Sequence, residues 1–150
     1  MKTVSADEMG FCNLQKWRIV MKIAVRYYSR SGNTKAVADA IAEAAGVSAV
    51  SVDQKDADIT ESTEVLFIGG ALYAYGLDSH LKEYLQRLDG AYVKRAVVFS
   101  TSWISKHAID LIQKSLAKKG IDVAEEAFYV KSNPSEARLK AAADFAKKYI

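Results

Sequence analysis

Six small polar residues separate an apolar run from an amphipathic segment near the start of the chain. Residues 22–28 are mostly β-branched, aromatic or aliphatic; Ser29-Arg30-Ser31-Gly32-Asn33-Thr34 follow, and alanine, valine and isoleucine then recur at helical spacing. This first loop (residues 29–34) offers hydroxyl groups, an amide side chain and the backbone N–H groups of a helix N-terminus, all of which suit a phosphate. A glycine lets the backbone turn and approach the anion closely. We expect a phosphate site here, the alternative being a polar turn whose side chains only cap the helix.

Other phosphate-binding and phosphotransfer signatures do not account for this loop. The triphosphate loop G-x-x-x-x-G-K-[ST] and the dinucleotide fingerprint G-x-G-x-x-G are both absent. Tyr28 and Ser29 stand where a receiver domain would carry acidic residues. The single cysteine, Cys12, lies too far upstream to act as the nucleophile of a thiol phosphatase. The ligand is therefore expected to be bound rather than attacked by a side chain of this loop.

Short apolar runs alternate with amphipathic segments from residue 21 onward, and this pattern predicts parallel strands joined by helical crossovers. We expect strands at 22–28, 47–52, 65–69, 95–100 and 123–130, and helices at 34–45, 79–88, 106–119 and 134–149. Gly46 and Gly120 are typical helix ends, and Asn133-Pro134 is typical of a helix start, with Asn133 as the cap.

The fold class that this order predicts is α/β: a three-layer, doubly wound, five-stranded parallel sheet with strand order 2-1-3-4-5. The polar stretch 53–64 is too short for a full helical crossover, and we expect a loop or a single helical turn there. In such sheets ligands bind at the carboxyl ends of the strands, beside the first and third strands. The first loop falls at that place.

The first loop resembles a known family. Tyr28-Ser29-Arg30-Ser31-Gly32-Asn33-Thr34 is similar to the flavodoxin phosphate loop, [ST]-x-[ST]-G-N-T after an apolar strand, which in that family holds the 5′-phosphate of FMN. The resemblance covers most of residues 21–150 and is specific. It implies an FMN-binding domain over 21–150, with Ser29, Arg30, Ser31, Gly32, Asn33 and Thr34 at the phosphate, and a redox protein that carries electrons between partner proteins.

Two further loops carry the resemblance. The segment Gly69 to Gly76 is similar to the G-A-S-I-x-x-G stretch that wraps one side of the flavin, and Thr101-Ser102-Trp103 stands where the family contacts the pyrimidine edge. An aromatic ring stacked on the flavin would lower its potential. The alternative is that these aromatic side chains pack in the core. The resemblance implies cofactor contacts in a second loop (residues 71–76) and a third loop (residues 101–103): Ala71, Leu72, Tyr73, Ala74, Tyr75, Gly76, Thr101, Ser102 and Trp103.

No side chain is expected to be catalytic, because the flavin would do the chemistry. His107 begins a predicted helix and is typical of a solvated first-turn residue. His80 opens another helix, and we expect it to have no carboxylate partner. Asp78 and Asp53 are interpreted as cap and loop residues.

Two other functions stay open at this stage. Flavodoxin-like protoporphyrinogen oxidases and quinone reductases share a loop of the kind carried here by Gly70, Ala71, Tyr75 and Gly76, although the extra loop of those oxidases after the fourth strand is missing. A non-redox domain that binds a phosphate ligand is the second alternative, because a fold does not dictate its function.

Composition limits which classes of binding partner and which cellular compartment are expected. The chain has 150 residues and a formal net charge of +3, without a run of five basic residues, so nothing points to nucleic acid. The flavin surroundings are expected to be less negative than in acidic flavodoxins, because of Arg30, Lys35 and Lys106. Since that negative charge steers flavodoxins toward basic partner surfaces, the redox partner proteins of this chain stay unidentified. One cysteine, no apolar stretch of about 18 residues and no signal peptide predict a cytoplasmic protein without a membrane span. Residues 1–20 are expected to be an N-terminal extension, disordered as chain ends often are.

Overall fold

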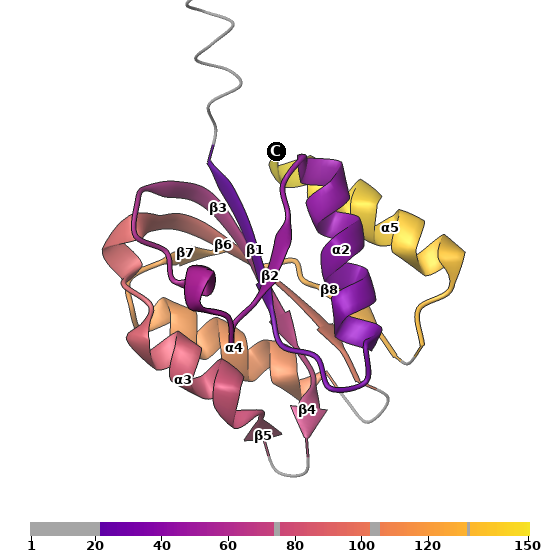
Figure 1. The fold of residues 1–150 in the computed structure, drawn as a ribbon, viewed down its shortest axis with the longest axis horizontal. Coiled ribbons are helices and arrows are strands. Elements are labelled where there is room, and N and C mark those ends of the chain that lie inside the picture. Colours follow the sequence, from indigo (N-terminus) through magenta and orange to yellow (C-terminus); the bar gives the residue numbers. More distant parts are fainter. Residues whose placement is uncertain (1–21, 74–75, 103–105, 132) are drawn as a thin grey trace, which may run out of the picture.

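The computed structural model describes residues 22–73, 76–102, 106–131 and 133–150, and the expected N-terminal extension lies outside these ranges. The described elements, labelled in Figure 1, are β1 (Ile23–Tyr27), α2 (Asn33–Ala45), β2 (Ala49–Ser51), η1 (Lys55–Ala57), β3 (Thr63–Gly70), β4 (Leu72–Tyr73), β5 (Gly76–Leu77), α3 (Ser79–Arg87), η2 (Gly90–Tyr92), β6 (Val93–Thr101), α4 (His107–Ala117), β7 (Asp122–Val123), β8 (Phe128–Val130), α5 (Glu136–Ala146) and η3 (Lys147–Tyr149). Within these ranges no helix is both long and apolar enough to cross a membrane.

The main sheet has the strand order β2-β1-β3-β6-β7, and β8 also pairs with β6. Every pairing in it is parallel. Because β7 and β8 follow one another along the same edge of β6, the order is the predicted 2-1-3-4-5 with the last strand in two pieces. The predicted fold class is confirmed, and so is the single helical turn in the short crossover, which is η1.

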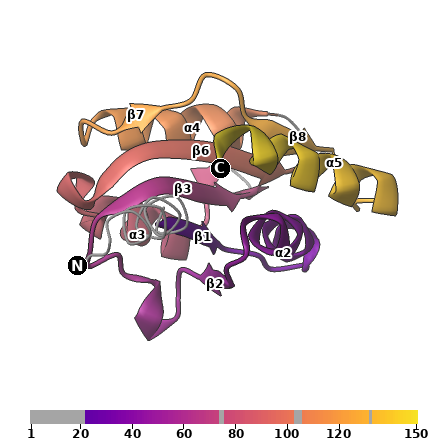
Figure 2. The ribbon, with the colours of Figure 1, turned by 90° about the horizontal axis from the view of Figure 1, so that it is seen from above.

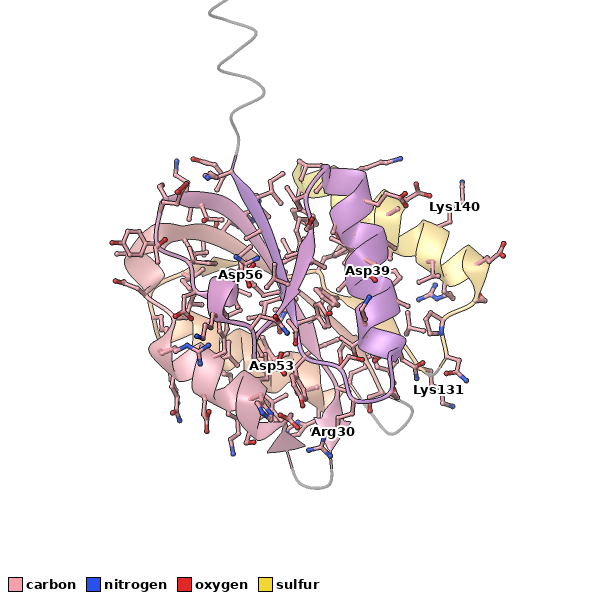
Figure 3. All side chains as sticks on the ribbon, viewed as in Figure 1. Arg30, Asp39, Asp53, Asp56, Lys131 and Lys140 are labelled. Carbon is pink, nitrogen blue, oxygen red and sulfur yellow. The ribbon has the colours of Figure 1, made fainter. Side chains whose placement is uncertain are left out.

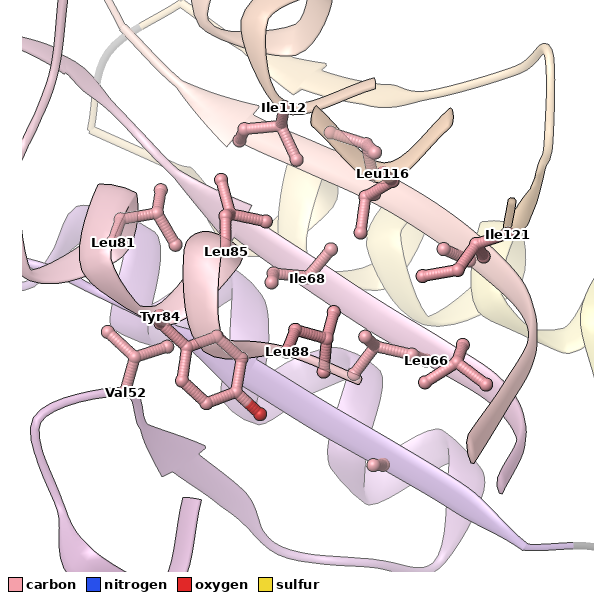
Figure 4. Close-up of a cluster of buried hydrophobic side chains, with 14 of the residues drawn as sticks. Val52, Leu66, Ile68, Leu81, Tyr84, Leu85, Leu88, Ile112, Leu116 and Ile121 are labelled. Carbon is pink, nitrogen blue, oxygen red and sulfur yellow. The ribbon is translucent and has the colours of Figure 1, made fainter. Parts of the chain in front are cut away.

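Helices cover both faces of this sheet (Figures 1 and 2). On one face α2 and α5 lie over a cluster that includes Val25, Phe67 and Val97. The opposite face carries α3 and α4, and Figure 4 shows the cluster there, in which Leu66 and Ile68 of β3 lie among side chains of both helices. The alternation of Leu66, Phe67 and Ile68 between the two clusters follows from the two-residue repeat of a strand buried on both faces. This burial fixes the carboxyl ends of β1, β3 and β6 at one edge of the molecule.

The last strand differs from the prediction because it bulges. Asp122 and Val123 pair with Arg95 and Ala96, and pairing resumes where Phe128 meets Phe99. Four residues, 124–127, thus stand opposite two residues of β6, and the extra residues bulge out of the strand pairing. A single apolar run in the sequence gives no sign of this register change.

The start of the last helix was also predicted wrongly. Ser135, not Asn133, is the cap of α5, and its Oγ accepts a hydrogen bond of 3.2 Å from the backbone N–H of Arg138. Serine and asparagine are about equally good caps, so the choice between them depended on where the chain leaves β8. Gly46 caps the end of α2 with φ +74°, and Gly120 follows α4 with φ +78°, as expected.

Candidate functional site

The first loop turns directly from β1 into α2. Gly32 has φ +95° and precedes the first helical residue, Asn33, so this glycine makes the left-handed turn that the loop needs. The backbone N–H of Gly32 donates to Ser29 Oγ over 2.9 Å, and that of Asn33 donates to Ser31 Oγ over 3.5 Å. Because both serine hydroxyls act as acceptors in these bonds, each keeps its own hydrogen to donate to a ligand. The loop thus presents hydroxyl donors at the positive end of a helix.

Thr34 connects the first loop to the third. Its Oγ1 lies 2.6 Å from Thr101 Oγ1, and either hydroxyl can be the donor. Both side chains are buried, Thr34 with 1% and Thr101 with 4% of its surface exposed. When Thr101 donates, the hydrogen of the Thr34 hydroxyl is left for an anion in the first loop.

Asp78 connects the first loop to the segment that follows the second. Arg30 donates to Asp78 Oδ2 from Nε over 2.9 Å and from Nη2 over 2.6 Å. The other carboxylate oxygen accepts the backbone N–H of His80 and contacts His80 Nδ1 at 2.9 Å. The His80 ring stacks on Tyr28, with ring centres 4.6 Å apart and an angle of 12° between the planes. Burial opposes ionisation, but the hydrogen bonds from His80 and Arg30 outweigh it and hold the pKa of Asp78 below its ordinary value.

The second loop follows the glycine-rich end of β3. A Cβ on Gly69 would lie 2.5 Å from the backbone oxygen of Phe99, and one on Gly70 would lie 2.5 Å from Leu81 Cδ2. Gly69 is therefore required by close packing against backbone rather than by an unusual backbone angle, whereas the contact at Gly70 is with the end of a side chain that can move. Beyond them β4 and β5 form a short antiparallel hairpin that the sequence pattern did not predict. Ala71, Leu72 and Gly76 are half-buried there.

The third loop leaves β6 next to the last strand. The backbone N–H of Ser102 donates to Val130 O over 3.1 Å, and the Tyr129 hydroxyl donates to Ser102 O. Ser102 is buried, with 8% of its surface exposed. These bonds fix the described part of the loop against β8.

Three of the predicted site residues, Ala74, Tyr75 and Trp103, lie outside the described residues, so the stacking of an aromatic side chain on the flavin stays a prediction. The other predicted residues lie on three loops at the carboxyl edge of the sheet. Among the described residues, a side-chain link from Arg30 to Asp78 joins the first loop to the start of α3, and one from Thr34 to Thr101 joins it to the third loop.

Sequence reasoning missed the partnership of Asp78, Arg30 and His80. The expectation that His80 has no carboxylate partner is wrong, because a carboxylate two residues earlier in the chain bends back to it as the cap of α3. Arg30 and Asp78 are 48 residues apart in the chain. The signal that would have found them is the predicted strand order, which places the ends of the first and third strands side by side.

The charges near the first loop are more nearly balanced than its sequence indicates. Arg30 is paired with Asp78, and Lys35 Nζ lies 2.8 Å from Asp39 Oδ2. The Nζ of Lys106, the third cation, lies 5.4 Å from the centre of the Tyr129 ring. The first loop therefore offers an anion mainly neutral donors.

Comparison with solved structures places the fold among flavodoxins. A flavodoxin from the domain Archaea is 23% identical with a TM-score of 0.74, over 86% of this chain and 99% of its own. Flavodoxin 1 from Bacillus cereus is 19% identical with a TM-score of 0.70, over 85% of this chain and 96% of its own. The rubredoxin oxygen:oxidoreductase of Desulfovibrio gigas is 16% identical with a TM-score of 0.74, over 96% of this chain but only 40% of its own. At these identities the likeness establishes the fold alone.

Sequence comparison supplies the family. No curated protein matches the chain. The family model described as a flavodoxin domain matches residues 24–138, which include the first two loops and the described part of the third. The chain belongs to the flavodoxin family, and that membership implies a flavin cofactor.

Proposed function

We propose that this protein binds FMN across the three loops and carries electrons between partner proteins. The observation that carries the proposal is the first loop, where a left-handed glycine, two serine hydroxyls that keep their hydrogens and the N-terminus of α2 converge. This donor set fits a phosphate monoester, and a flavin that ends in one is FMN. FMN supplies the electron-transfer chemistry, while the chain binds and orients it.

Each loop has a distinct part in this proposal. Ser29, Ser31, Asn33 and Thr34 hold the phosphate, on the turn that Gly32 makes. The second loop lies along one side of the ring, and its half-buried Leu72 supplies apolar surface there. The third loop presents backbone groups of Thr101 and Ser102 to the polar edge of the flavin. The links between the loops hold these parts in register before the cofactor arrives, which reduces the entropy lost on binding.

An anaerobic redox titration of the FMN-loaded protein tests the carrier function. We expect two separate one-electron steps, with the second at a more negative potential than in free FMN. A single two-electron step at the potential of free FMN would contradict a one-electron carrier.

Turnover assays separate the carrier from the enzyme alternative. Steady-state reduction of quinones by NAD(P)H, or oxidation of a porphyrinogen, is followed with the loaded protein alone and with a generic flavodoxin reductase added. The carrier proposal predicts electron transfer to an acceptor only when the reductase is present. Rapid turnover without the reductase would identify a stand-alone oxidoreductase instead.

A further inference from the structure

Two cations flank the proposed phosphate site, and a carboxylate holds each of them. Arg30 Nη2 lies 2.6 Å from Asp78 Oδ2, and Lys35 Nζ lies 2.8 Å from Asp39 Oδ2. Figure 3 shows Arg30 at the edge beside β5 and Asp39 on α2. The two cations are about equally exposed, Arg30 at 56% and Lys35 at 57%, but their carboxylates differ: the Asp78 side chain is 4% exposed and that of Asp39 is 50% exposed. Water and salt screen the Lys35 pair far more than the Asp78 carboxylate.

Asp78 is anchored more firmly than a helix cap requires. Its Oδ1 accepts the backbone N–H of His80 and contacts the ring nitrogen of the same residue, while Oδ2 receives both donors from Arg30. The cap of α3 needs only the first of these bonds. The hydrogen bonds keep the pKa of Asp78 low despite its burial, so the group is a carboxylate at neutral pH. Its negative charge therefore offsets that of Arg30, which lies between two of the proposed phosphate-binding serines.

We propose that Asp78 sets the charge of the first loop: by neutralising Arg30 it makes phosphate binding depend on neutral donors and on the flavin ring rather than on net charge. The inference rests on the proposed function and deepens it. An unbalanced guanidinium next to Ser31 would attract any phosphate-bearing ion, and inorganic phosphate and nucleotides would compete for the loop. With the charge balanced, contacts with the ring decide which phosphate ester stays bound. Asp78 is a positioning residue in this account, since it acts through Arg30.

Three variants test the charge balance, because the charge left in the first loop decides whether FMN affinity falls or rises with salt. Asp78→Asn leaves the first loop with one excess positive charge, Arg30→Gln leaves it with one excess negative charge, and the double variant restores neutrality. Affinity for FMN is measured by titration of each apo-protein at about 0.01 M and about 1 M NaCl, between which the screening length falls from about 30 Å to about 3 Å. We expect Asp78→Asn to bind FMN about tenfold more tightly at low salt than at high salt, Arg30→Gln to show the opposite trend, and the double variant to respond as the wild type does.

Asp39→Asn is the matched control. It makes the same change of charge at the other cation beside the loop, but the carboxylate that it removes is half-exposed, so the salt dependence of its FMN affinity is expected to change less than that of Asp78→Asn. Riboflavin is the control ligand, because it lacks the phosphate, and its affinity is expected to be insensitive to salt in every variant. Circular dichroism confirms that each variant is folded, and Arg30→Gln alone still tests the sign if Asp78→Asn fails to fold.

Specific outcomes overturn the proposal. Equal salt dependence in all variants would show that Asp78 does not set the charge of the loop. An equal loss of FMN and riboflavin affinity in Asp78→Asn, with unchanged salt dependence, would make Asp78 a helix cap only. If the wild type binds no FMN, the proposed function has failed; the charge balance is then tested with inorganic phosphate, which must bind Asp78→Asn more tightly than Arg30→Gln.

Discussion

Replacing Thr34 by valine removes one hydroxyl of a buried pair while nearly preserving the shape of the side chain. The two Oγ1 atoms are 2.6 Å apart, and Thr34 and Thr101 are 1% and 4% exposed, so the hydroxyl left behind has little access to water. A buried polar group that loses its partner costs about 1–3 kcal/mol, whereas replacing both partners by apolar groups of the same shape is nearly neutral. We expect Thr34→Val and Thr101→Val each to lower the free energy of unfolding by about 1–3 kcal/mol, and the double variant to recover at least about 1 kcal/mol relative to the sum of the two losses.

Urea denaturation followed by circular dichroism measures these four stabilities, and FMN titration of the same proteins separates stability from binding. We propose that the Thr34 hydroxyl also donates to the phosphate, so the double variant should regain stability without regaining FMN affinity. Losses that simply add in the double variant would show that the two hydroxyls do not bond. Full recovery of FMN affinity in the double variant would remove Thr34 from the phosphate site.

Three further predictions concern the left-handed turn at Gly32, the buried carboxylate of Asp78 and the aromatic side chains expected on the flavin. Gly32→Ala should cost about 1–2 kcal/mol in urea unfolding, because φ is +95° and an added Cβ meets nothing within 4 Å, so the strain is confined to the backbone; no loss would contradict the left-handed turn. Asp78→Asn should lower the free energy of unfolding more at about pH 7 than at about pH 3. The pKa of Asp78 is lower in the folded protein than its ordinary value of 3.8, so the carboxylate stabilises the fold above pH 3.8, and this contribution is lost as the pH falls through the folded pKa. Equal losses at the two pH values would show that the pKa of Asp78 is not lowered by folding. Tyr75→Ala or Trp103→Ala should make the more negative of the two one-electron potentials of the flavin less negative. The shift is roughly 40 mV for each kcal/mol by which the ring contact favours one oxidation state of the flavin over the other. Unchanged potentials in both variants would show that neither side chain lies on the ring.

The layers and strand order could be predicted because each follows from a repeated local signal. Val25, Phe67 and Val97 belong to apolar runs whose length and spacing from helical segments indicate parallel strands buried on both faces. The first loop was found for a similar reason, since its donors and its glycine are adjacent in sequence. Gly32 indeed has the left-handed backbone that a tight turn into a helix needs.

The parts that escaped prediction depend on contacts between distant residues or on register. The bulge opposite Val97 and Val98 arises from how many residues the chain places between two pairings, which no apolar pattern encodes. The link between Arg30 and Asp78 joins the first loop to the start of α3, and each residue alone is an ordinary surface cation or helix cap. The pairing of Thr34 with Thr101 likewise exists only once the ends of β1 and β6 are placed near each other.

Whether the first loop binds the phosphate of FMN is decided by titration of apo-protein with FMN and with riboflavin, which lacks that phosphate. Ser31→Ala removes one hydroxyl from an exposed loop position without changing any charge. A hydrogen bond to a charged group contributes about 1.5–3 kcal/mol, so the variant should bind FMN at least about tenfold more weakly than the wild type and bind riboflavin equally well. Equal losses for the two ligands, or none for FMN, would place the phosphate elsewhere than the first loop.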